Sequence, residues 1–129
     1  MIAIDTNVIV RFLTNDDAKQ SEKAKALITR EEVFVATTVL LETEWVLRYS
    51  YRYPAADIHD RLVAFAGLPN VTLADSALII TALDGMAAGM DFADALHLAA
   101  AQGCEAFVTF DRALAKVAGR LGGVEVRAP

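Results

Sequence analysis

Short runs of apolar residues alternate with longer segments of helical periodicity along the whole chain. At residues 2–4, 33–36 and 106–108 these runs lack the polar–apolar alternation of a half-exposed strand, which is typical of parallel strands that are covered on both faces. Five such runs are present, at residues 2–4, 33–36, 71–73, 106–110 and 124–126. The alternation predicts an α/β fold, a three-layer α/β/α sandwich with a mainly parallel central sheet.

The segments between the runs carry apolar residues three and four positions apart, as an amphipathic helix does. Asp16 and Asp17 are expected to cap the second of these helices, and Thr37 or Thr38 to cap the third. Helices are predicted over residues 6–15, 18–30, 39–50, 55–68, 92–102 and 112–121. A further helix is predicted to start at Asp75 or Ser76 and to end near Gly85 or Gly89.

The length of 129 residues predicts a single domain over residues 1–129. The longest apolar runs are too short to span a bilayer, although the mean hydropathy is high at +0.37. The first residues lack the basic start and long apolar core of a signal peptide. One cysteine, Cys104, excludes an intrachain disulfide. Together these features predict a cytoplasmic protein with no membrane segment.

Four carboxylates stand where functional groups gather in parallel α/β folds. Asp5 follows the first predicted strand and Asp111 follows the fourth. Asp94 lies in the first turn of the helix that leads into the fourth strand, and Glu42 lies on the helix after the second. All four are therefore expected at one edge of the sheet.

Helix capping is the competing explanation for the aspartates. Asp5 and Asp111 each precede a predicted helix, and Asp91 and Asp94 form a D-x-x-D pair close to a capping box. An aspartate cap contributes about 1 kcal/mol, so capping alone accounts for any one of them.

Capping does not account for Glu42, which lies beyond the first helical turn. Its neighbours three and four positions away are apolar, and a carboxylate among apolar groups is costly unless something pairs with it. Glu44 differs, because Arg48 follows it at the favoured i+4 spacing. A metal ion is the expected partner of Glu42, although both glutamates fall within apolar arcs and periodicity alone leaves the choice open.

A cluster of carboxylates suits a hard cation that takes oxygen ligands, which favours Mg²⁺ with Mn²⁺ as a substitute. Neither His59 nor His97 is spaced as part of a zinc-binding pair, and the chain has no second cysteine. His97 is expected to pack in the core or a groove.

Four motifs in this order, "IDTNVIVRFL", "VLLETEWVLR", "DFADALHLA" and "VTFDRAL", resemble the PIN-domain family. The resemblance is closest to VapC-type ribonuclease toxins of bacterial toxin–antitoxin pairs and extends from Ile2 to about Leu114. It implies a Mg²⁺-dependent endoribonuclease, a homodimer, and inhibition by a small antitoxin protein.

The acidic quartet of that family falls on Asp5, Glu42, Asp94 and Asp111. Asp5 and Asp94 are expected to anchor the principal Mg²⁺, while Glu42 and Asp111 complete the site and orient or deprotonate the attacking water. The resemblance also matches supporting polar groups beside these acids at Thr6, Asn7 and Thr109. Asp91 is an extra acid one turn before Asp94 and is expected to support the site from outside the quartet.

The charge balance fits a site of this kind. The chain has 12 basic and 17 acidic residues and a net charge of −5, which disfavours loose binding of nucleic acid over a basic surface. Without the four site acids the remainder is nearly neutral. Arg11 and Arg112 are the candidates to contact RNA phosphate, and a solvated arginine is the alternative for each.

Two other functions compete. A phosphatase with an aspartyl nucleophile would be expected to carry D-x-D, but Thr6 and Asn7 follow Asp5; a Gly-rich phosphate loop is absent as well. A PIN-like module that binds RNA or protein without nuclease activity stays open as the second reading.

Overall fold

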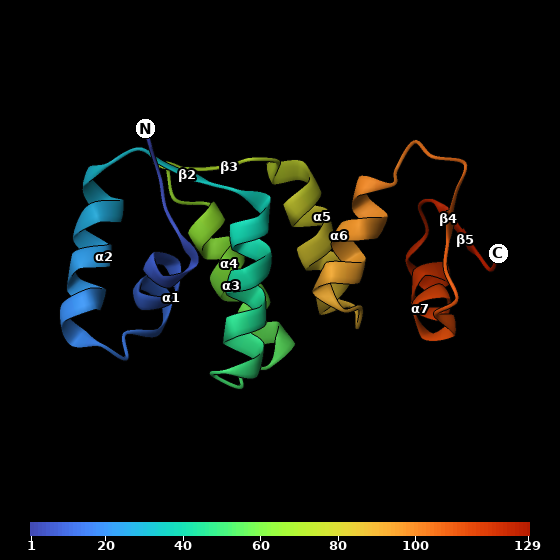
Figure 1. The fold of residues 1–129 in the computed structure, drawn as a ribbon, viewed down its shortest axis with the longest axis horizontal. Coiled ribbons are helices and arrows are strands. Elements are labelled where there is room, and N and C mark those ends of the chain that lie inside the picture. Colours follow the sequence, from blue (N-terminus) through green and yellow to red (C-terminus); the bar gives the residue numbers. More distant parts are fainter. The chain divides into compact units, whose positions relative to one another are not determined.

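The computed structural model describes all residues from 1 to 129. The chain divides into two compact units, an N-terminal unit over Met1–Ser76 and a C-terminal unit over Ala77–Pro129 (Figure 1). The single domain over residues 1–129 stays a prediction. No helix in the structure combines the length and the apolar character that crossing a bilayer requires.

The N-terminal unit is built on a parallel three-stranded sheet with the order β1-β2-β3. Val33 at the start of the middle strand lies opposite Ile2 on one side and Val71 on the other. The strands of this unit are β1 (Ile2–Ala3), β2 (Val33–Val35) and β3 (Val71–Leu73). Its helices are α1 (Thr6–Thr14), α2 (Ala18–Arg30), α3 (Thr37–Tyr49) and α4 (Ala55–Ala66).

The core of this unit comes from the apolar positions of those helices and strands. Phe65 is buried and its ring lies 5.8 Å from that of Phe12, which joins α4 to α1. Each fully buried side chain of this size contributes about 1.5–3 kcal/mol. Side chains that are less than 2% exposed here include Ile9, Val33, Leu40, Leu47, Ile58 and Leu62.

The C-terminal unit contains α5 (Ser76–Ala87), which begins at the boundary, then α6 (Phe92–Ala100), β4 (Ala106–Val108), α7 (Arg112–Leu121) and β5 (Glu125–Arg127). A Cβ atom at Gly85 of α5 would stand 3.3 Å from the Cβ of Ala95 in α6. The glycine therefore allows the two helices to approach closely. β4 and β5 pair in parallel, with Phe107 opposite Val126.

The predicted α/β class with parallel strand pairing is confirmed, and so is the order of the five strands and seven helices. The strands pair as three and two, one sheet in each unit. The prediction that residues 106–110 form one covered strand is wrong at its end, because Val108 is 52% and Phe110 is 87% exposed. β4 ends at Val108, so Phe110 lies in the connection to α7 and not in a strand.

Aspartate caps are confirmed at Asp17 for α2 and at Asp111 for α7. The prediction that Thr37 or Thr38 caps α3 is wrong. Ala36 occupies that position and makes no side-chain capping bond. Because β2 ends at Val35, only one residue separates strand from helix, and both threonines fall inside the helix.

Candidate active site

Asp5 lies at the carboxyl end of β1 and is the N-cap of α1. Its backbone is extended, with φ −94° and ψ 168°, and its Oδ1 accepts a hydrogen bond of 2.7 Å from the backbone N–H of Thr6. The side chain is exposed. A negative charge at this place is favoured by the helix dipole, and the carboxylate keeps its other oxygen for a ligand.

Thr6 connects this carboxylate to Glu42. The hydroxyl of Thr6 donates to Oε1 of Glu42, and it also lies 3.5 Å from the backbone carbonyl of Val39. Thr6 is 6% exposed, so its hydroxyl is shielded from competing water. The predicted supporting role of Thr6 thus has a geometric basis, because it orients one oxygen of Glu42.

The environment predicted for Glu42 is wrong. Glu42 is exposed, and the buried glutamate is Glu44, at 1% exposure. Glu44 pairs with Arg48 as expected, through Nε at 2.9 Å and Nη2 at 3.0 Å. Residues two positions apart on an α-helix point in directions that differ by about 200° around the helix axis. One glutamate therefore faces the core and the other faces solvent, and apolar neighbours in the sequence did not distinguish them.

A cavity of about 360 Å³ opens beside Asp5 and Glu42. It brings together several of the predicted site residues of the N-terminal unit, which lie on α1 and α3. Its lining consists of Asp5, Thr6, Asn7, Val10, Arg11, Glu42, Val46, Ser50 and Tyr51. The polar side chains of the lining are therefore two carboxylates, three hydroxyls, an amide and a guanidinium, all of which suit a polar ligand.

Arg11 is not the solvated arginine of the alternative reading. Its Nη1 donates to Oδ1 of Asp16 at 2.8 Å, and the hydroxyl of Tyr51 donates to the other oxygen of Asp16 at 2.6 Å. The hydrogen bonds from Tyr51, Thr14 and Arg11 lower the pKa of Asp16 to about 2. Sequence reasoning missed Asp16 and Tyr51, since no local pattern relates positions 35 residues apart.

The C-terminal unit positions its acids by capping. Asp91 is the N-cap of α6 and accepts from the backbone N–H of Asp94 at 3.1 Å. Asp111 is the N-cap of α7 and accepts from the N–H of Leu114 at 3.0 Å. The hydroxyl oxygen of Thr109 accepts from the N–H of Asp111 at 3.0 Å, which fixes the turn between β4 and α7.

Asp94 is half-buried and close to other negative charges. Burial raises the pKa of the Asp94 carboxyl, and the charges of Asp91 and Asp111 raise it further, while His97 opposes the shift. These three aspartates therefore share one negative field, which a cation would relieve. His97 itself is exposed, so the prediction that it packs in the core or a groove is wrong. Arg112, at the start of α7, is also exposed.

The predicted quartet is divided equally between the units. Asp5 and Glu42 belong to the N-terminal unit, and Asp94 and Asp111 to the C-terminal unit. Neither unit alone assembles three acidic, histidine or cysteine side chains as a metal-binding group. The oxygen-only donors fit a hard cation such as Mg²⁺, and a site of four carboxylates stays a prediction.

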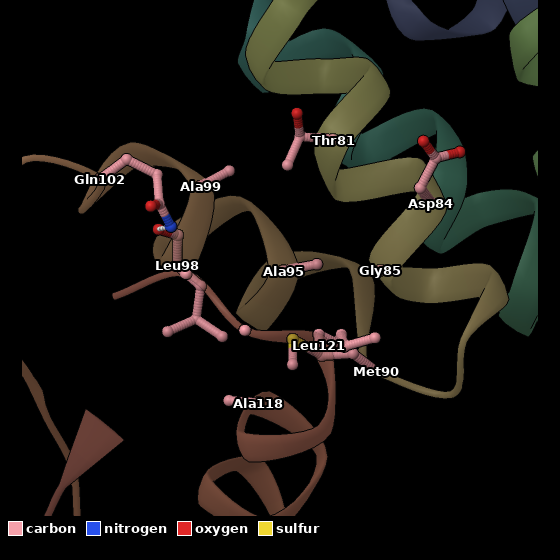
Figure 2. A pocket seen from close by; sticks show the side chains of 12 residues that line it. Thr81, Asp84, Gly85, Met90, Ala95, Leu98, Ala99, Gln102, Ala118 and Leu121 are labelled. Atoms are coloured by element: carbon pink, nitrogen blue, oxygen red, sulfur yellow. Dashed lines mark hydrogen bonds between the residues drawn. The ribbon is translucent and has the colours of Figure 1, made fainter. Parts of the chain in front are cut away.

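A second cavity, of about 480 Å³, lies in the C-terminal unit and is lined by α5, α6 and α7 (Figure 2). Small and apolar side chains dominate its lining, including Met90, Leu98 and Leu121. Asp84 is its one carboxylate, and none of the predicted site acids lines it. Its other polar side chains are Thr81 and Gln102, and its lining includes no arginine and no second carboxylate.

Comparison with known protein families gives a match to the PIN domain over residues 2–120, which spans nearly the whole chain. No curated protein matches. The match includes both units and all four predicted acids. The chain therefore belongs to the PIN domain family, whose members are generally nucleases that use divalent metal ions.

Proposed function

We propose that this protein is a Mg²⁺-dependent endoribonuclease that acts in the cytoplasm as the toxin of a toxin–antitoxin pair. The observation that carries the proposal is the placement of four carboxylates, at Asp5, Glu42, Asp94 and Asp111, in a chain that matches the PIN domain over 2–120. Three of them lie at helix N-termini, since Asp5 and Asp111 are N-caps and Asp94 lies in the first turn of α6.

The residues present could hold Mg²⁺ through Asp5 and Asp94, with Glu42 and Asp111 completing the site. When bound, the ion would lower the pKa of a water and offset the charge that develops at phosphorus. Manganese, which accepts the same oxygen ligands, is expected to substitute.

Glu42 is the proposed proton acceptor for the attacking water. Its Oε1 is engaged by the Thr6 hydroxyl, so Oε2 is left to receive a proton. Its exposure keeps this oxygen within reach of water and substrate. Asp111 is held by its capping bond to Leu114, which presents its second oxygen in a defined direction. Asn7 and Arg11 line the same cavity as Asp5 and complete its polar surface.

Cleavage assays on purified variants test the activity. Asp5→Asn and Asp94→Asn are expected to abolish Mg²⁺-dependent cleavage of RNA while the melting temperature is retained. Asp57→Asn, an exposed acid in the first turn of α4, is the matched control and keeps full activity. Wild-type rates in the two site variants would refute the proposal, and RNA binding without cleavage by the wild type would favour the non-nuclease reading.

The partners are proposed on the same basis. A homodimer and a small antitoxin are expected, and light scattering of the purified protein measures the first. For the second, induced expression should arrest growth, and co-expression of the neighbouring small gene should relieve the arrest. Growth unaffected by an active nuclease would overturn the toxin role while leaving the enzymatic proposal intact.

A further inference from the structure

Arg11 lies in the wall of the cavity that Asp5 and Glu42 share, yet its hydrogen bonds go elsewhere. A guanidinium has five N–H donors. Nε donates to Oε1 of Gln20 at 2.6 Å, and Nη1 donates to Asp16 at 2.8 Å and to the hydroxyl of Tyr51 at 3.2 Å. These bonds use Nε and Nη1, and they leave the two N–H groups of Nη2 for an external acceptor.

Three separate segments hold this arginine. Asp16 lies between α1 and α2, Gln20 lies in the first turns of α2, and Tyr51 follows α3. The chain also anchors the backbone of Arg11, because the hydroxyl of fully buried Ser21 donates to its carbonyl at 2.8 Å. A side chain fixed in this way loses little conformational entropy on binding, which favours a preorganised contact.

The hydrogen-bond partners of Arg11 also indicate its role. An arginine that served to neutralise Asp5 and Glu42 would bond to them, but Arg11 bonds to Asp16 instead. The two site carboxylates thus stay available for a cation, and Arg11 lines the cavity that they share. A phosphodiester has anionic oxygens that can bind a cation and also accept hydrogen bonds from a guanidinium. A cation site with an arginine in the same cavity therefore suits a phosphodiester ligand.

We propose that Arg11 binds a backbone phosphate of the RNA substrate beside the bond that is cut, and that Tyr51 and Asp16 are positioning residues that hold its guanidinium for this contact. The inference rests on the proposed function, because it takes RNA as the ligand. Tyr51 acts through its hydroxyl, which donates to Asp16 and accepts from Arg11.

Binding of a short fluorescein-labelled oligouridylate tests the contact. Fluorescence anisotropy with Mg²⁺ in an Asp94→Asn background measures binding without loss of the probe to cleavage. Arg11→Met is expected to weaken binding about tenfold, and the slope of log affinity against log salt should fall by about 0.7, as for one lost phosphate contact on a single strand. Arg30→Met, at the exposed end of α2, is the control for loss of a positive charge.

Tyr51→Phe tests the positioning role, because it removes the hydroxyl without a change in charge. It is expected to weaken binding about threefold, and to have no further effect in a protein that already carries Arg11→Met. Tyr53→Phe is the matched control, since its ring lies 5.9 Å from that of Tyr51. Arg11→Gln, which removes the charge but keeps a polar side chain, replaces Arg11→Met if that variant does not fold.

The outcomes separate the two proposals. Wild-type affinity and salt slope in the Arg11 variants overturn the phosphate contact. Equal losses from Tyr51→Phe with and without Arg11 overturn the positioning role. Cleavage by the wild type is measured in parallel, so a protein that binds RNA through Arg11 but does not cut it contradicts the nuclease proposal and leaves this inference standing.

Discussion

The hydroxyl of Thr6 donates a hydrogen bond to the carboxylate of Glu42, a residue 36 positions further along the chain. Thr6 begins α1 and directly follows Asp5, while Glu42 belongs to α3. The bond therefore links the end of the first strand to a helix after the second. The backbone N–H of Thr6 also donates to Asp5, so this one residue holds two exposed carboxylates that line the same cavity.

Replacement of Thr6 by valine should reduce activity more than stability. Valine keeps the shape of threonine, so the free energy of unfolding is expected to fall by about 1 kcal/mol from the lost hydrogen bond. RNA cleavage should fall about tenfold, since Glu42 is no longer oriented. Cleavage rates and urea unfolding measure the two effects. Thr72→Val, on the exposed face of β3, serves as the control, and an unchanged rate in Thr6→Val would show that Glu42 needs no tether.

Two substitutions at Asp111 should separate its capping role from its charge. Asparagine caps a helix about as well as aspartate, whereas alanine does not. Asp111→Asn is thus expected to keep the stability of the wild type, and Asp111→Ala to lose about 1 kcal/mol. Both should lose RNA cleavage if the carboxylate takes part in the reaction. Thermal unfolding and a cleavage assay on the same preparations decide this, and activity in Asp111→Asn would count against the site.

Asp94 should make the metal-free protein less stable as the pH rises. Its pKa in the folded protein is raised above 3.8 by burial and by the charges of Asp91 and Asp111. The folded state then binds more protons than the unfolded state in this range, so stability falls as the pH increases through the folded pKa. Denaturant unfolding with a chelator should show wild type losing stability relative to Asp94→Asn between pH 3.8 and neutrality. If the free energies of unfolding of the two proteins changed with pH in parallel, Asp94 would not be affected by the charges of Asp91 and Asp111.

The contribution of Asp16 to stability should depend on pH in the opposite direction. Its pKa is lowered to about 2, first by the hydrogen bond from Tyr51, so its contribution is present above pH 3.8 and is lost as the pH falls toward 2. Titration of the carboxyl carbon by NMR should give a midpoint near 2 in the wild type. Tyr51→Phe is expected to move the midpoint toward 3.8, while Tyr53→Phe leaves it in place. A midpoint that ignores Tyr51→Phe would remove this tyrosine from the network.

The two glutamates of α3 should differ in what they stabilise. Glu44 is buried and pairs with Arg48. Glu44→Ala removes the carboxylate of this pair and is expected to lower the free energy of unfolding by about 2 kcal/mol. This is less than for a fully buried pair, because the Arg48 side chain is one-third exposed. Glu42→Ala, at an exposed position, should leave the free energy of unfolding nearly unchanged. Urea unfolding of both variants provides the comparison, and equal losses would show that exposure does not distinguish them.

Most of the fold follows from local patterns in the sequence. Continuous apolar runs mark β1, β2 and β4, and aspartates before helical segments mark where α1, α2, α6 and α7 begin. Ends that depend on neighbouring elements are harder to predict. The N-cap of α3 falls on Ala36 because β2 ends at Val35, and Phe110 lies beyond β4, which ends at Val108.

The environment of the site residues depends on tertiary contacts, which periodicity does not contain. Glu42 and Glu44 have similar neighbours in the sequence, and only the packing of α3 decides which one is buried. The partners of Arg11 illustrate the same point. Asn15, at the C-cap of α1 with a left-handed φ of 58°, turns the chain so that Asp16 reaches back to Arg11. Tyr51 then completes the group from a distant segment.

The dual role of the capping aspartates has an evolutionary consequence. Asp5 and Asp111 each hold the start of a helix and each belong to the proposed catalytic acids. Codons for aspartate and asparagine differ by one base, and asparagine preserves the cap. A lineage under selection to lose the activity can therefore do so in a single mutational step without unfolding the protein. Inactive relatives with intact folds should accordingly carry asparagine at these two positions more often than alanine.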